Sequence, residues 1–150
     1  MKITGMTARL LAVDASPRFG DEGIPPGRPS IWHYPLITLH TDEGIDGYTM
    51  GYGNQGDGRA IAYLVRDVYL AELIGENPLH IEKLWQKIRR RTRHMYALMD
   101  ALVGIVDIAL WDILGKSMNQ PIANLLGIYR TKVPGYATGY RFHPTPEQVY

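Results

Sequence analysis

The sequence contains no cysteine, and its opposite charges nearly cancel to a formal net charge of +1. The missing thiols exclude a disulfide framework and thiolate metal sites, and they are typical of a reducing compartment. We therefore expect a cytoplasmic protein. The balanced charge gives no electrostatic reason to bind nucleic acid or an anionic membrane, so we expect neither partner.

Long uninterrupted apolar runs are also absent. Residues 1–13 are broken by threonine and by Arg9, which is unlike a secretory signal peptide. The most apolar stretch, Leu98–Leu114, carries three aspartates, each of which would cost about 2.5–3.5 kcal/mol at the centre of a membrane helix. We expect a buried helix of a globular domain instead, and 150 residues with 45% hydrophobic content are sufficient for a real core.

The first third of the chain predicts three strands. Residues 2–14 and 31–41 are rich in apolar and β-compatible types, and 45–50 returns after the turn Asp42-Glu43-Gly44 as a hairpin partner. Pro35 suggests an edge strand or an irregular start. Between the first two strands, residues 15–30 hold four prolines and three glycines, a composition that predicts a long loop of the kind that is often functional.

The hydrophobic period then changes to that of helices. Ile61, Leu64, Val65, Val68 and Ala71 lie at helical spacing, and Gly75 is a suitable stop. Further helices are predicted from the Asn77-Pro78 cap, over residues 96–116, where the pattern is apolar nearly all round, and after Pro121 up to Gly127. Strands followed by helices predict an α+β domain over residues 1–126.

A second unit is expected to begin near residue 127. Lys132–Gly139 predicts a strand, and Thr145-Pro146-Glu147-Gln148 is a capping box that opens a helix. A helix needs roughly 12–15 residues to be stable, and the sequence ends at Tyr150, one turn later. We therefore expect residues 127–150 to be an incomplete domain and the chain to be a fragment.

Three motifs have both a functional and a structural interpretation. Gly51–Gly56 matches the G-x-G-x-x-G pattern of dinucleotide-binding loops, but the helix after it leads to another helix instead of a parallel strand. Asp100 and Asp107 share a helix face and could form a metal or acid–base pair, although carboxylates bonded to backbone N–H groups or arginine are the simpler interpretation. The basic run comprises Lys87, Arg89, Arg90, Arg91 and Arg93; it could bind nucleic acid, but a solvated or intersubunit face at a helix end fits better.

The third predicted helix carries a recognisable signature. Residues 101–127 include the run Asp-Ile-Ala-Leu-Trp-Asp at 107–112, Gly115-Lys116, Pro121 and Leu125-Leu126-Gly127, followed by Val133-Pro134-Gly135-Tyr136-Ala137. This pattern closely resembles the mandelate racemase and muconate lactonizing group of the enolase superfamily, and the order of predicted elements resembles it along the whole chain.

The resemblance implies an architecture and a chemistry. The three-stranded antiparallel sheet and the helical bundle would form an α+β capping domain that leads into the first β/α unit of a TIM-like (β/α) barrel. The barrel would bind Mg²⁺ and abstract a proton next to a carboxylate, with the metal stabilising the enediolate. All metal ligands and catalytic bases are expected beyond Tyr150, so no catalytic residue is assigned within this chain.

The same resemblance assigns substrate selection to two lid loops, residues 15–30 and 50–58, and to the end of the first barrel strand. Arginine can grip a carboxylate through two hydrogen bonds, whereas aromatic and methionine side chains can form pocket walls. The candidate substrate-binding residues are Arg18, Phe19, Arg28, Met50, Tyr52, Thr138, Tyr140 and Arg141. Tyr48 and Met50 replace the tryptophan and glutamate that are commoner in the family at the second loop.

The leading hypothesis is a Mg²⁺-dependent sugar-acid dehydratase, because two arginines in a polar lid suit a polyhydroxylated acid. A racemase or epimerase and a cycloisomerase of the same superfamily are alternatives, and a non-catalytic binding or assembly module is an alternative from another class. We expect a small carboxylate as ligand and a homo-oligomer as the assembly.

Overall fold

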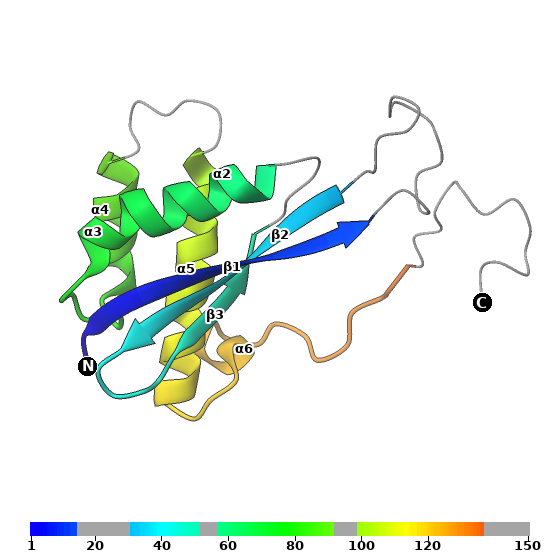
Figure 1. Cartoon of the computed structure of the whole chain (residues 1–150). Coiled ribbons are helices and arrows are strands. Elements are labelled where there is room, and N and C mark those ends of the chain that lie inside the picture. The colour runs from blue at the N-terminus through cyan, green and yellow to red at the C-terminus, as the bar shows by residue number, and fades with distance from the viewer. Residues whose placement is uncertain (15–30, 52–56, 92–98, 137–150) are drawn as a thin grey trace, which may run out of the picture.

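The computed structural model describes residues 1–14, 31–51, 57–91 and 99–136. Its elements are the strands β1 (Ile3–Asp14), β2 (Ile31–Thr41) and β3 (Gly47–Met50), followed by helices. The helices are α2 (Asp57–Tyr63), the π segment η1 (Leu64–Tyr69), α3 (Leu70–Leu73), α4 (Ile81–Arg91), α5 (Met99–Ser117) and α6 (Ile122–Leu125). The predicted order, three strands and then helices, is confirmed (Figure 1).

The sheet is antiparallel, in the order β1-β2-β3. Gly44 makes the turn into β3 with a φ of 74°, and the buried Thr41 hydroxyl donates to the Ile45 carbonyl at 2.9 Å. β2 is the central strand, so the prediction of an edge strand from Pro35 is wrong. The nitrogen and the carbonyl of a residue in an antiparallel strand point to the same side. The Pro35 carbonyl accepts a hydrogen bond from Gly51 N at 2.9 Å, so the Pro35 nitrogen faces the side where β3 has already ended. The proline, which has no N–H to donate, is therefore tolerated at this position.

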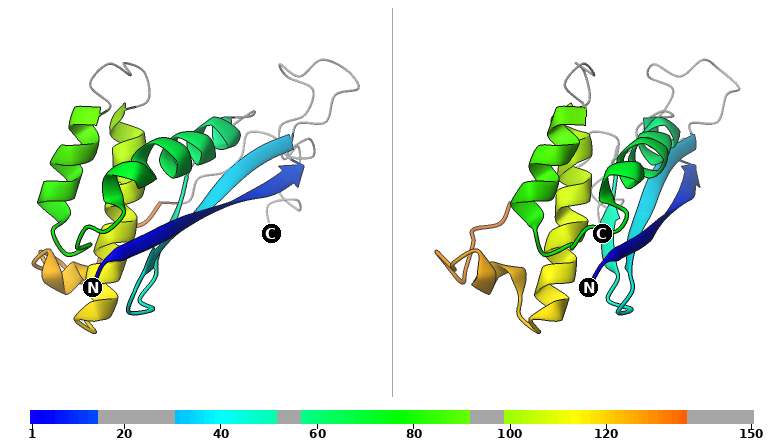
Figure 2. Two further views of the ribbon diagram at one scale, coloured as in Figure 1. Left: turned by 60° about the vertical axis from the view of Figure 1, so that its left-hand side comes forward. Right: turned by 90° about the vertical axis from the view of Figure 1, so that its left-hand side faces the viewer.

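The helices cover one face of the sheet (Figure 2). The core lies between these layers. Strand residues such as Ile37 and Leu39, the α4 residues Leu84 and Ile88, and Leu110 of α5 are all almost completely buried. The predicted central helix is confirmed as α5, which packs against β3, β2, η1, α4 and α6.

Helix α2, segment η1 and helix α3 run on as one helix with a widened middle. Its buried residues Ile61, Val65, Tyr69 and Leu73 recur every four positions. In a regular α-helix of 3.6 residues per turn, that spacing would drift by about 40° per step, whereas the wider π turn keeps all four side chains on the core. The phase shift also explains why Ala71, predicted on the apolar face, is exposed.

The next two helix starts follow the local chemistry. The Asn77 side chain accepts from Leu79 N at 3.0 Å, as expected of a cap, but this caps a single turn, and α4 itself begins at Ile81. At the other end of the domain, α6 is followed by Gly127 with a φ of 77°. The strand predicted over 132–139 is not formed in residues 132–136, because no described strand lies beside them to share hydrogen bonds.

Two close backbone approaches require glycine. A Cβ atom at Gly47 would collide with the carbonyl oxygen of Ala109 and lie 2.8 Å from Ile113 Cγ1, so β3 rests directly on α5. A Cβ at Gly58 would collide with the His33 carbonyl, so α2 rests directly on β2. These contacts set the distance between the helical layer and the sheet.

We expect Gly47→Ala to lower the free energy of unfolding by about 1–3 kcal/mol, because the added methyl must push β3 away from α5. Urea denaturation measures this. Gly104→Ala is the matched control, since none of the described residues outside its own helical turns has an atom within 4 Å of its Cβ position, and alanine favours a helix by about 1 kcal/mol over glycine. Equal effects of the two substitutions would contradict the account.

Candidate functional site

Both predicted lid loops leave the sheet at the same end. β1 ends at Asp14, β2 begins beside it at Ile31, and β3 ends at Met50, which pairs with Leu36. Leu36 lies five positions along β2 from Ile31, which is about 17 Å at 3.4 Å per residue. The roots of the two loops therefore lie at the same end of the sheet.

Of the predicted substrate-binding residues, the structure describes only Met50. It is the last residue of β3 and its side chain is 58% exposed at the root of the second loop. The other candidates lie outside the described residues: Arg18, Phe19, Arg28, Tyr52, Thr138, Tyr140 and Arg141. Their assigned roles stay predictions.

Gly51, the first glycine of the G-x-G-x-x-G match, has a packing role. A Cβ atom there would lie 2.7 Å from Pro35 Cγ and 3.0 Å from Ile61 Cγ2, so this glycine fits where β2 and α2 meet. β3 is antiparallel to β2, and the helix after the loop leads to α4. Over the described residues there is accordingly no βαβ unit, which the dinucleotide interpretation requires.

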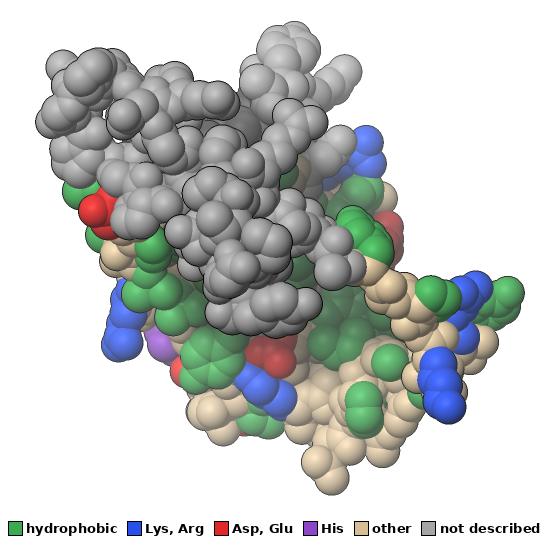
Figure 3. Space-filling view, turned by 90° about the vertical axis from the view of Figure 1, so that its right-hand side faces the viewer, with side chains coloured by type: hydrophobic (Ala, Val, Ile, Leu, Met, Phe, Trp, Pro, Cys, Tyr) green, Lys and Arg blue, Asp and Glu red, His purple; other side chains and the backbone are tan. Residues whose placement is uncertain are grey.

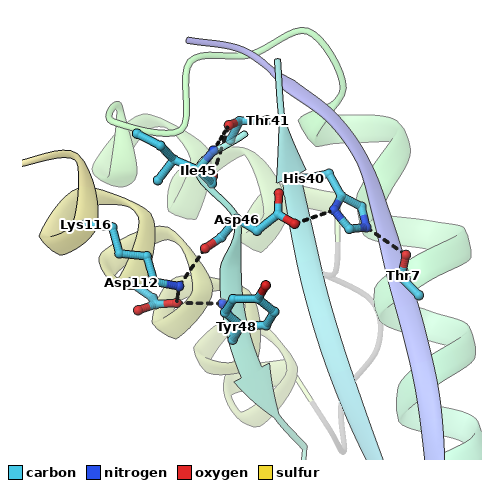
Figure 4. A network of polar contacts seen from close by, with 8 residues as sticks. All are labelled: Thr7, His40, Thr41, Ile45, Asp46, Tyr48, Asp112 and Lys116. Atoms are coloured by element: carbon cyan, nitrogen blue, oxygen red, sulfur yellow. Dashed lines mark hydrogen bonds and ion pairs between the residues drawn. The ribbon is translucent and has the colours of Figure 1, made fainter. Parts of the chain in front are cut away.

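A carboxylate on α5 fixes the strand that ends at Met50 (Figure 4). Asp112 accepts a hydrogen bond from Tyr48 N at 2.8 Å and another from Lys116 Nζ at 2.5 Å. The Lys116 ammonium also donates to the Asp46 carbonyl at 2.7 Å and lies 4.2 Å from the centre of the Tyr48 ring. The outward N–H of β3 is therefore satisfied by a charged acceptor, which strengthens the bond.

The contacts continue across the sheet through His40. Its Nδ1 lies 2.9 Å from Asp46 Oδ2 and its Nε2 lies 2.7 Å from Thr7 Oγ1. Since a carboxylate only accepts, a neutral ring donates from Nδ1 to Asp46 and accepts the Thr7 hydroxyl proton at Nε2. One chain of polar contacts thus joins β1, β2, the hairpin and α5 (Figure 4).

The simpler interpretation gave Asp100 and Asp107 backbone N–H groups or arginine as partners, and for Asp107 the structure places the Trp111 side chain there instead. Asp112 is bonded to a backbone N–H, although its cation is lysine and not arginine. Burial raises the pKa of the Asp107 carboxyl; nearby Glu82 adds to this effect, and a hydrogen bond from Trp111 opposes it. The side chain of Asp100 lies outside the described residues, so the proposed pairing with Asp107 is untested.

Part of the basic run on α4 is neutralised within the domain. Lys87 Nζ lies 3.0 Å from Glu76 Oε1 and donates to the Glu72 carbonyl at 2.7 Å, and Arg91 lies 3.8 Å from Glu72. Hydrogen bonds from Lys83 and Lys87 hold the pKa of the Glu76 carboxyl below its usual range. This pairing favours the interpretation as a solvated or intersubunit face over nucleic-acid binding.

Sequence reasoning missed a polar pair near the loop roots. The Arg59 guanidinium donates to His33 Nε2 at 3.2 Å, and among the described residues the buried His33 Nδ1 has no hydrogen-bond partner. Arg59 lies in the first turn of α2, where a cation opposes the helix dipole. A cation at this unfavourable position is the sequence feature from which the pair could have been found. The exposed Arg59 side chain places a positive charge at the end of the sheet from which the two predicted lid loops leave.

The described residues contain neither a metal-binding group nor a membrane-spanning helix. In these ranges, no group of three or more histidine, aspartate or glutamate side chains is placed to hold a metal ion. No helix within the same ranges has both the length and the apolarity of a membrane span.

Comparison with known proteins now identifies the family. Residues 30–127 match the model of the mandelate racemase / muconate lactonizing enzyme N-terminal domain. The chain belongs to this family, and the resemblance seen in the α5 signature is confirmed. The three-stranded sheet followed by helices is the capping-domain architecture expected of it.

Two curated relatives, each 37% identical to this chain, are named as dehydratases of sugar acids. The D-galactonate dehydratase of Klebsiella pneumoniae (strain 342) is 37% identical over 118 residues, which is 72% of this chain and 29% of that enzyme. The arabinonate dehydratase of Saccharolobus solfataricus is 37% identical over 112 residues, which is 71% of this chain and 30% of that enzyme. The chain therefore spans about a third of the length of these relatives.

Solved structures with the same fold include proteins named for other activities. The 3,6-anhydro-D-galactonate cycloisomerase of Zobellia galactanivorans is 27% identical with a TM-score of 0.66, over 85% of this chain and 32% of that one. A racemase of Streptomyces coelicolor A3(2) with bound magnesium is 24% identical with a TM-score of 0.65, over 77% of this chain and 32% of that one. The latter likeness concerns the fold alone.

We expect Asp112→Ala to lower the free energy of unfolding by about 1.5–3 kcal/mol, because it removes the charged acceptor of the Tyr48 N–H. Thermal denaturation followed by circular dichroism measures this. Asp67→Ala is the control: among the described residues, Asp67 forms an ion pair only with its exposed neighbour Arg66, so its loss should cost about 0.5 kcal/mol or less. A smaller loss for Asp112→Ala than for Asp67→Ala would contradict the structural role of this carboxylate.

Proposed function

We propose that this chain is the capping, substrate-selecting part of a dehydratase that acts on sugar acids. In such a reaction a base removes the proton from the carbon next to the carboxylate and hydroxide leaves the neighbouring carbon. The enol so formed becomes a 2-keto acid. The observation that supports the proposal most strongly is the 37% identity to two relatives named as dehydratases of sugar acids.

The geometry of the cap fits this role. Two loops whose roots lie at one end of the sheet can close over one ligand and exclude water, which strengthens the electrostatic interactions inside. Arg59 adds an exposed cation at that end, suited to attracting an anionic acid. The proposed contacts are Arg18 and Arg28 for carboxylate or hydroxyl groups, and Phe19, Met50 and Tyr52 for the walls.

A second face of the cap is suited to covering the remainder of the protein. Hydrophobic side chains border a hollow beside the segment that leaves α6 (Figure 3). Large apolar residues of α5 and of this segment are exposed, among them Ile108, Leu126 and Ile128. Exposed apolar area of this kind marks an interaction surface. The proposed partner is a barrel domain that supplies the catalytic bases, with Thr138, Tyr140 and Arg141 at the end of its first strand.

The proposed cofactor of the whole protein is Mg²⁺. The described residues do not fit the metal, since they contain no cluster of ligands for it, and its site would be formed by other parts of the protein. Membership of the mandelate racemase / muconate lactonizing enzyme family supports this assignment, because that resemblance implies a Mg²⁺ ion in the barrel.

The full-length protein, supplied with Mg²⁺ and a panel of sugar acids that includes D-galactonate and arabinonate, should release a 2-keto acid. Derivatisation of the keto group with semicarbazide detects the product. Exchange of the α-proton without loss of water would indicate a racemase or epimerase, and ring formation without release of a keto acid would indicate a cycloisomerase. Either result, or no turnover of any acid, would contradict the dehydratase proposal.

Arg28→Gln should lower kcat/KM by about 10-fold to 100-fold, the equivalent of one lost charge-assisted hydrogen bond. Arg66→Gln is the matched control, because Arg66 is an exposed residue of η1 that pairs with Asp67, away from the lid end. Unchanged kcat/KM in Arg28→Gln would remove this residue from the proposed substrate contacts.

A further inference from the structure

A histidine interrupts the apolar face of β2 near the end from which the lid loops leave. Pro35, Ile37 and Leu39 are buried, and His33 is an even number of positions away, so its side chain points to the same face. The start of α2 lies beside this part of β2 in both views of Figure 2. A Cβ atom at Gly58 of α2 would lie 3.1 Å from His33 Cβ, so the histidine is directly under the first turn of the helix.

The His33 ring makes one hydrogen bond in the part of the chain that the structure describes. The Arg59 guanidinium donates to its Nε2 at 3.2 Å. Because a guanidinium has donors only, Nε2 must accept, and the ring is therefore neutral with its proton on Nδ1. The contact thus holds the arginine in place without supplying a negative charge.

Arg59 differs in this respect from most other cations of the helices. Its side chain is exposed, and it is in no ion pair with a residue that the structure describes. Histidine accepts one of its five N–H groups and leaves four for another partner. An arginine with an uncompensated charge is suited to binding an anion through charge-assisted hydrogen bonds. By contrast, five cations of the helices are each in an ion pair with a carboxylate: Arg66, Lys83, Lys87, Arg91 and Lys116.

The His33–Arg59 contact connects the ends of the two predicted lid loops. His33 is two positions after Ile31, where the chain enters β2 from the first loop. Arg59 directly follows the second loop, residues 50–58, and belongs to the first turn of α2. A guanidinium held at this junction is placed to border a ligand over which both loops close.

We propose that Arg59 binds the sugar acid through a charge-assisted hydrogen bond, and that His33 is the positioning residue that holds Arg59 without neutralising it. The proposal rests on the proposed function, because its ligand is the acid over which the lid loops close. A carboxylate at position 33 would hold the arginine more firmly, but it would cancel the charge that attracts the acid. The neutral imidazole fixes the guanidinium and leaves that charge available.

Two isosteric substitutions in the full-length protein separate the charge at position 33 from its hydrogen bond. Glutamine and glutamate both present a side-chain oxygen that can accept from Arg59, but only glutamate neutralises it. With a sugar acid that the protein turns over, KM should be about 10-fold higher in His33→Glu than in His33→Gln, the equivalent of one charge-assisted hydrogen bond. The kcat values should be similar, since the contact is present in the ground state and in the transition state. A purely structural role predicts no such increase, because the ion pair would hold α2 on β2 at least as well.

Arg59→Gln tests the substrate contact itself, at an exposed position where the substitution leaves the fold intact. We expect KM to rise by about 10-fold while kcat changes little. Arg66→Gln is the matched control, because it makes the same change at an exposed arginine that is paired with Asp67. Thermal denaturation establishes that each variant is folded. An Arg59→Gln variant with the KM of the parent, or a KM in His33→Glu no higher than in His33→Gln, would overturn the proposal.

Failure of this inference is distinguishable from failure of the proposed function. A parent protein that releases no 2-keto acid from any sugar acid contradicts the dehydratase, and titration calorimetry with D-galactonate then supplies a Kd in place of KM. Binding by the parent that is weakened about 10-fold in Arg59→Gln would support the role of Arg59. No binding by the parent, or equal binding by parent and variant, would overturn it.

Discussion

The seating of β3 on α5 is the contact on which the candidate site depends. Gly47 lets the strand touch the backbone of Ala109, and Asp112 then holds the Tyr48 N–H at 2.8 Å. Two residues later the strand ends at Met50, so the root of the second predicted lid loop is fixed to the longest helix of the domain. The root of the first loop is fixed by the β1–β2 pairing. The proposed closure of both loops over one ligand would depend on both of these anchors.

The family signature in α5 has a physical explanation within this domain. Its Asp112 and Lys116 are four residues apart and therefore share one face of the helix, where they bind the backbone of the hairpin at Tyr48 and Asp46. Asp107 lies on another face and borders a groove between α4 and α5. In the described residues, Asp112 and Lys116 of the family signature thus hold the hairpin against α5.

Much of the fold could be predicted from residue patterns. Alternation and turn chemistry located the three strands to within two residues, and the apolar run located α5. The predictions that failed concern positions where contacts with other parts of the chain, and not the local sequence, determine the structure. Pro35 lies in a central strand because its nitrogen faces the end of β3, and Ala71 is exposed because a π segment shifts the helix phase. The strand expected at 132–139 needs a partner strand to form. Of the site, the pattern located both loop roots but missed the Arg59–His33 pair, which depends on packing between α2 and β2.

In the proposed function, two loops at one end of the cap close over the same acid. Hydrogen exchange of the full-length protein, with and without a saturating sugar acid that it turns over, measures this closure. We expect the acid to slow amide exchange in residues 15–30 and in 50–58 together, and to leave exchange in the hairpin turn at 42–44 unchanged. Protection of only one loop, or protection of the hairpin turn at the opposite end of the sheet, would contradict it.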